Sequence, residues 1–204
     1  MKMIKIFIIL IIIAGVFIIV TKRANTSSQK ITSALVGEKL CDLFIEGYKS
    51  PQEIERIKKE FSISAENTEV YLCLSSLYFL GFIRASQAES IAIPPEKIEK
   101  ISHSLASFLV AKYIALHGVD EDVDGLLQRQ NKLTQQFMKT WDKNLNSKPS
   151  PHWYVGKEVG YFLKGKKSTP DPAFITFCAE TFSNDTITIK SFLDEVQEKL
   201  SIDE

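Results

Sequence analysis

Three aspartates at alternate positions, Asp120, Asp122 and Asp124, precede Gly125 near the middle of the chain. This spacing matches the first half of a calcium loop between two helices, where carboxylates occupy positions 1, 3 and 5 and glycine turns the chain at position 6. The second half does not match, because position 12 is Asn131 and not the glutamate that would supply two oxygens. We therefore expect weak calcium binding at most. The interpretation that we favour is that the aspartates cap a helix N-terminus and complement its dipole.

The other residues that could do chemistry do not predict a catalytic site. His103 and His117 are fourteen residues apart, which separates them by about 21 Å along one helix, and His152 lies in a predicted loop. Glu158 is the one carboxylate within an aromatic-rich stretch, and its alternative interpretation is a solvated helix residue paired with a neighbouring lysine. The chain has no nucleophile elbow, zincin helix, phosphate loop or dinucleotide fingerprint. We predict no catalytic residue, and calcium is the only candidate cofactor.

The three cysteines, Cys41, Cys73 and Cys178, each lie in an apolar helical pattern. Their spacing does not match that of metal-ligand pairs, so we expect buried free thiols. One disulfide with a thiol left over is the alternative, and it would matter only outside the cytoplasm.

The formal net charge of zero, from 25 basic and 25 acidic residues, is the sum of two unlike parts. Residues 1–30 contain five basic residues and no acidic one, so residues 31–204 carry 20 basic and 25 acidic residues. A chain with 45% apolar residues, three cysteines and this acidic remainder is neither disordered, nor a disulfide scaffold, nor a strongly basic nucleic-acid binder. We expect Lys164, Lys166 and Lys167 to lie in a solvated loop, with contact to anionic lipid headgroups as the alternative.

The N-terminal segment predicts a membrane anchor. Every residue from 6 to 20 is apolar or glycine, and basic residues flank this run on both sides. A helix over residues 3–21 would just cross a hydrocarbon core about 30 Å thick, so we predict a single-pass anchor within residues 1–23. A cleaved signal sequence is the alternative, although cleavage after Ala24 would put Lys22 at the −3 position, where a small residue is typical. Because the N-terminus is short and basic, we expect the domain that follows to lie outside the cytoplasm.

Residues 24–30 form a polar tether, and apolar residues recur at three- and four-residue steps through nearly all of the chain after it. The residues that mark helix starts and ends in this region are Pro51, Ser64, Pro95, Gly118 and Pro172. We predict an all-α bundle of about seven helices that forms a single domain, residues 31–204, after one transmembrane helix.

Two segments leave room for another interpretation. Residues 70–83 contain no charged residue, and we expect a buried core helix there, with a second membrane span as the alternative. Residues 186–189 alternate between Thr and Ile and are the one candidate strand. This strand would separate a helix that begins at Asp171 from a last helix over residues 192–200.

A set of residues between positions 73 and 117 shares the pattern of a known family. They are Cys73, Gly81, the run Ile93, Pro94 and Pro95, and a helix that ends at Tyr113 and His117. In these residues the chain resembles small secreted helical immunity proteins of the Rap1a/Tai kind, although it lacks the paired cysteines of that pattern. The resemblance implies a secreted immunity-type protein.

Together these patterns favour a membrane-anchored helical interaction or accessory module that binds another protein, contacts the bilayer through residues 3–21 and does not bind nucleic acid. The alternatives are an extracytoplasmic enzyme with a dispersed active site, for which Glu158 is the first candidate, a weak calcium-binding module, and the immunity-type protein. A pocket with converging polar groups would favour the enzyme, whereas an exposed apolar patch would favour the interaction module.

Overall fold

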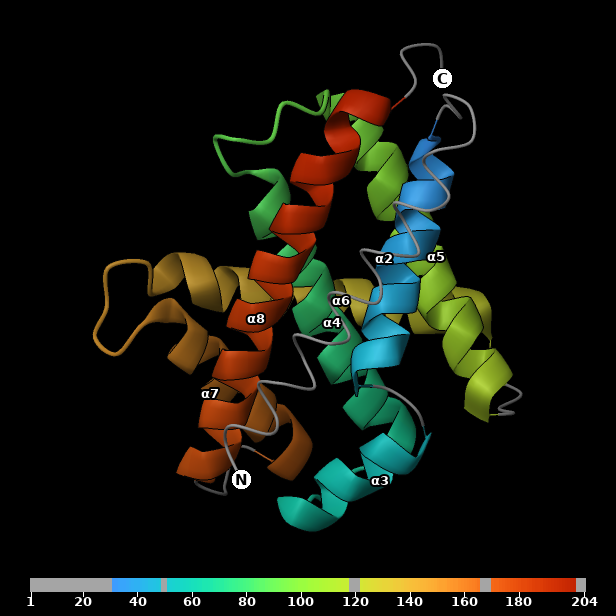
Figure 1. Cartoon of the computed structure of the whole chain (residues 1–204). Helices are drawn as coiled ribbons and strands as arrows, with labels where there is room; N and C mark the ends of the chain where they lie inside the picture. Colours follow the sequence, from blue (N-terminus) through green and yellow to red (C-terminus); the bar gives the residue numbers. More distant parts are fainter. Residues whose placement is uncertain (1–30, 49–50, 118–121, 166–169, 201–204) are drawn as a thin grey trace, which may run out of the picture.

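A computed structural model describes residues 31–48, 51–117, 122–165 and 170–200 (Figure 1). Within these ranges the helices are α2 (Ser33–Tyr48), α3 (Pro51–Glu60), α4 (Asn67–Ser86), α5 (Pro95–His117), α6 (Val123–Lys143), α7 (Pro151–Lys164) and α8 (Pro172–Val196), followed by the 3-10 turn η1 (Gln197–Lys199). The same ranges contain no strand beyond an isolated parallel bridge between Ile31 and Leu200. The prediction of an all-α bundle of about seven helices is confirmed.

The predicted anchor, its signal-sequence alternative and the polar tether all lie within residues 1–30, outside the described part of the chain. Among the helices that are described, none combines the length and the apolar character needed to cross a bilayer.

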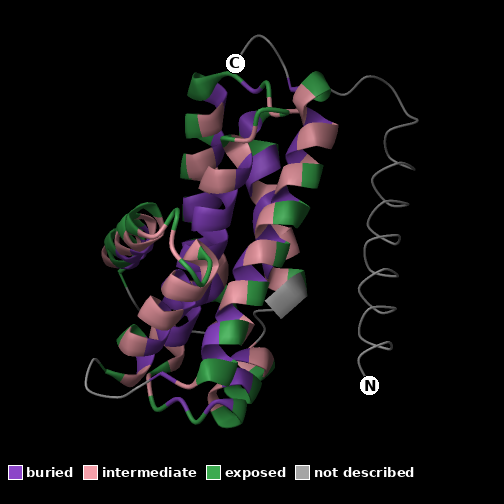
Figure 2. Cartoon of the chain, turned by 90° about the vertical axis from the view of Figure 1, so that its left-hand side faces the viewer, coloured by how far each residue is buried: buried purple, intermediate pink, exposed green. Residues whose placement is uncertain are grey.

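Helix α4 is the centre of the bundle. Fourteen of its twenty residues are buried, including every residue from Val70 to Phe82. Burial on every face of a helix requires neighbours on every side, and α3, α5, α6, α7 and α8 all contact α4. Figure 2 shows buried residues gathered on the inward sides of the helices, with exposed residues on the outside. The uncharged run 70–83 is therefore part of a buried core helix, as predicted.

The outer helices pack in pairs around α4, with α2 against α5 and α7 against α8, while α6 crosses α4 and reaches α7 (Figure 1). Two glycines allow the pairs to approach closely. A Cβ added at Gly37 of α2 would lie 2.6 Å from the Ser104 Cβ, and one added at Gly156 of α7 would lie 2.6 Å from the Ile175 carbonyl oxygen. Neither helix pair can keep its present separation with a larger residue at these positions.

The turn between α3 and α4 differs from the sequence prediction, which put the helix start at Ser64. Helix α3 ends in a Schellman motif, because Ser62 adopts a left-handed conformation with φ 51° and the Ile63 N–H donates to the Lys58 carbonyl oxygen at 2.8 Å. The Ile63 side chain is buried in the core. Helix α4 therefore begins after Ser64, at Asn67, and Glu66 is the N-cap of α4.

Helix α8 is continuous over 25 residues, so the candidate strand at 186–189 and the separate last helix are wrong. A strand would put Ile187 and Ile189 on one face, but Ile187 is 62% exposed and Ile189 is fully buried. The Thr186 hydroxyl donates to the Phe182 carbonyl oxygen one turn earlier. Packing against α4 and α7 stabilises helix here against the β propensity of Thr and Ile.

Replacing Gly156 with alanine will lower the free energy of unfolding by about 1 to 3 kcal/mol, the usual effect of overpacking, because the new methyl group meets backbone. Gly81→Ala is the matched control, since Gly81 is also buried in a helix but its nearest neighbour is the Thr186 hydroxyl at 3.2 Å, on a side chain. Urea unfolding of the full chain in mild detergent, followed by circular dichroism, measures both. A Gly156→Ala protein at least as stable as Gly81→Ala would contradict the close α7–α8 packing.

Candidate interaction surface

Two aspartates of the predicted calcium loop, Asp122 and Asp124, lie at the start of α6. The Asp122 carboxylate is the N-cap and accepts hydrogen bonds from the backbone N–H groups of Asp124 at 3.3 Å and Gly125 at 3.0 Å. Asp122 is therefore a helix cap, as the favoured interpretation expects. Asp120 lies outside the described residues, and within them no group of three or more His, Cys, Asp or Glu side chains could hold a metal ion. Calcium binding that involves Asp120 stays a prediction.

Glu158 lies on α7 and is half-buried, with a partner that the sequence does not indicate. Its carboxylate accepts a hydrogen bond from the Gln136 side-chain amide, which joins α7 to α6. The neighbouring Lys157 ammonium lies 5.6 Å from the centroid of the Tyr161 ring. Glu158 thus joins two helices, and it does not line the groove on α6 or the one between α2 and α5.

The three histidines lie in three separate places. His103 is exposed on α5. The His117 ring packs at 4.5 Å between centroids against Tyr113, and the His152 ring packs at 4.7 Å against Trp141 and 5.0 Å against Phe182. Burial lowers the pKa of His117 and of His152.

All three cysteines are buried free thiols, as predicted. Burial is the main cause that raises the pKa of Cys41 to about 12 and the pKa of Cys73 well above its ordinary value. Because the thiolate is the reactive form, neither side chain is suited to act as a nucleophile at neutral pH.

The chain is basic in one segment and acidic on both sides of it. Residues 123–170, which contain α6 and α7, carry nine basic and three acidic residues. Residues 31–122 carry nine basic and fourteen acidic residues, and residues 171–204 carry two basic and eight acidic ones. Charge summed over residues 31–204 conceals this division, so the sequence prediction of a basic patch was limited to Lys164, Lys166 and Lys167. Of these three, only Lys164, at the end of α7, lies in the described part of the chain.

The outer side of α6 carries an open groove of about 490 Å³. It is lined by Lys132, Gln135, Gln136, Lys139, Thr140 and Lys143. The three lysines are exposed, and within the described residues no carboxylate lies within ion-pair distance of their ammonium groups. Two other charged residues of α6 differ in this respect, because Arg129 pairs with Glu69 of α4 and Asp142 pairs with Arg84 of α4. We call the six lining residues the α6 groove.

Searches against family models, curated proteins and solved structures found no match to this chain. The resemblance to immunity proteins therefore rests on the residues quoted for it alone.

Asp122→Ala will lower the free energy of unfolding by about 1 kcal/mol because it removes the α6 cap, whereas Asp122→Asn will have little effect because asparagine caps equally well. Thermal unfolding of both proteins, with and without millimolar calcium chloride, is the measurement. Calcium that stabilises the original chain but not Asp122→Asn would favour the metal site. Equal stability of Asp122→Ala and the original chain would contradict the cap.

The free energy of unfolding will fall as pH is lowered from about 7.5 to about 5.5. The ordinary pKa of histidine is about 6.5, and burial lowers the pKa of His117 and His152 in the folded chain. As pH falls, these histidines therefore take up protons in the unfolded chain before they do so in the folded chain. The free energy of unfolding falls between pH 6.5 and the lower pKa of the folded chain, by at most about 1.4 kcal/mol per pH unit for each histidine. Urea unfolding at several pH values measures this slope.

His152→Phe will reduce that slope, because phenylalanine does not titrate. The same slope in the original chain and in His152→Phe would contradict the role assigned to the buried imidazole.

Proposed function

We propose that this chain is a helical interaction module that is held at a membrane by its N-terminal segment and binds another protein there. The observation that supports the proposal best is the division of charge over the chain, with a basic segment at 123–170 and acidic segments on both sides. Charge separated in this way steers encounters and selects partners through complementary potentials. Membrane attachment is supported by the unbroken apolar run of residues 6–20, and the short basic N-terminus supports an extracytoplasmic domain.

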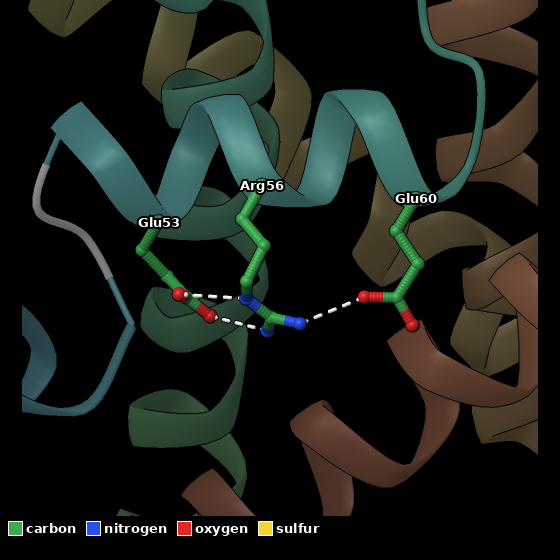
Figure 3. A network of polar contacts seen from close by, with 3 residues as sticks. All are labelled: Glu53, Arg56 and Glu60. Atoms are coloured by element: carbon green, nitrogen blue, oxygen red, sulfur yellow. Dashed lines mark hydrogen bonds and ion pairs between the residues drawn. The ribbon is translucent and has the colours of Figure 1, made fainter.

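Helix α3 carries an ordered cluster of two glutamates and one arginine at the surface of the domain. Its inner side is fixed in the core by Ile54 and Ile57, both buried. On its outer side the Arg56 guanidinium lies between two glutamates, with contacts of 2.5 Å to Glu53 and 2.7 Å to Glu60 (Figure 3). An isolated surface ion pair adds little stability, but this arrangement holds both carboxylates in place. An ordered pair of carboxylates loses less side-chain entropy on binding than a mobile pair.

The partner that fits α3 is a protein with a basic surface. The cluster of Glu53, Arg56 and Glu60 carries one net negative charge, although α3 as a whole is neutral because it has three acidic and three basic residues. The glutamates of the cluster can accept hydrogen bonds from lysine or arginine in addition to those from Arg56. Such a surface would contribute mainly to the rate and the selectivity of association.

Crosslinking in intact membranes, followed by co-purification of the full chain in gentle detergent, tests this function. We expect one or a few specific proteins to be recovered. Glu53→Gln with Glu60→Gln will reduce recovery by about three- to tenfold, which corresponds to about 1 kcal/mol of binding free energy. Glu96→Gln with Glu99→Gln, two exposed glutamates of α5, is the matched control and will preserve recovery.

Two results would contradict the proposal. Recovery of no specific protein by the original chain would overturn the interaction function itself. Equal recovery by the α3 and α5 variants would show that the partner binds a different side of the domain.

A further inference from the structure

We infer that the α6 groove binds the phosphates of anionic lipid headgroups, so that the outer side of α6 lies against the membrane surface. This inference rests on the membrane attachment in the proposed function. The groove offers three ammonium groups, from Lys132, Lys139 and Lys143, together with the amide of Gln135 and the hydroxyl of Thr140. All of these groups can donate hydrogen bonds to phosphate oxygens, and the ammonium groups add charge.

The length of the groove favours a surface with many phosphates over a single small anion. Lys132 and Lys143 are eleven residues apart on one helix, which separates them by about 17 Å along the axis. Three ammonium groups spread over that length cannot converge on one phosphate. A layer of lipid headgroups presents phosphates side by side, so each lysine can have its own partner.

Two other charges of α6 already have partners in α4, whereas the lysines of the groove are available to an external anion. Arg129 and Asp142 are neutralised by Glu69 and Arg84 of α4. The lysines of the groove are exposed and have no carboxylate within ion-pair distance in the described part of the chain. Lysines close to an anionic membrane are each attracted to its surface potential.

The predicted tether keeps the domain close to the bilayer. Residues 24–30 are seven residues long, and seven residues span at most about 25 Å when fully extended. That length is similar to the axial length of α2, about 24 Å for its sixteen residues. A domain held this close meets the headgroups repeatedly, which raises the effective concentration of lipid phosphate at the groove.

Lysine acetylation of the full chain in two kinds of vesicle tests the inference. One vesicle contains phosphatidylcholine alone, and the other also contains phosphatidylglycerol. Mass spectrometry then gives the acetylation rate of each lysine. We expect Lys132, Lys139 and Lys143 to react about three- to tenfold more slowly in the anionic vesicles, and high salt to remove the difference. Lys59 and Lys100, which are exposed on α3 and α5, will react equally in both.

A double variant shows whether the lysines act together. In Lys139→Gln with Lys143→Gln, the protection of the remaining Lys132 by anionic lipid will fall. In the matched control, Lys59→Gln with Lys100→Gln, the protection of Lys132 will persist. The far-ultraviolet circular dichroism of both variants will match that of the original chain, because all four lysines are exposed.

Three results would overturn the inference. Equal acetylation in the two vesicles would show that the groove does not bind anionic headgroups. If inorganic pyrophosphate in detergent protected the groove lysines from acetylation as well as anionic vesicles do, the groove would bind a soluble phosphate. If vesicles of phosphatidylcholine alone protected them, the contact with the membrane would not depend on lipid charge. None of these measurements needs a partner protein, so a negative result here leaves the proposed protein-interaction function untouched. Loss of the chain from both kinds of vesicle would instead contradict the membrane attachment.

Discussion

The complete burial of α4 determines how the other helices must be arranged. A helix that buries every residue from Val70 to Phe82 cannot lie at the surface on any side. Its polar groups then need partners inside the domain, because an unpaired buried hydroxyl costs about 1 to 3 kcal/mol. Three hydroxyls of α4 find such partners in three different helices, each at a backbone carbonyl oxygen.

These three hydrogen bonds fix the position of the neighbours along α4. Tyr71 donates to the Leu109 carbonyl oxygen of α5 at 2.7 Å, Tyr78 donates to the Leu40 carbonyl oxygen of α2 at 2.8 Å, and Ser76 donates to the Gln130 carbonyl oxygen of α6 at 3.2 Å. Apolar contact alone would tolerate a shift of one helix along another. A shift here would separate each hydroxyl from its acceptor, so the hydrogen bonds add specificity to packing that is otherwise non-directional. The outer sides of α2, α5 and α6 carry no such requirement and are free to differ in charge.

The sequence predicted the parts of the fold that local signals specify. Pro51, Pro95 and Pro172 each stand at the first position of a helix, where the missing N–H is not needed. Helix α8 was predicted incorrectly because local β propensity favoured a strand, whereas distant packing against α4 and α7 stabilises helix. The hydrogen bond between Gln136 and Glu158 could not be predicted, since the two residues are far apart in sequence and their proximity depends on how α6 and α7 cross. The α6 groove was missed for a different reason, because charge was summed over the whole domain before the outer side of one helix was known.

The bridge between Ile31 and Leu200 has a mechanical consequence for a domain held by a tether. The Ile31 N–H donates to the Lys199 carbonyl oxygen at 3.2 Å, so the first described residue is bonded to the turn that follows α8. Tension along a tether that enters at Ile31 would load this single hydrogen bond before any helix. Once it broke, α2 would be the next element under load, and α2 is held against α5 by the close approach at Gly37. Because the acceptor lies in the turn directly after α8, the same hydrogen bond joins the tethered end of the domain to its C-terminal helix.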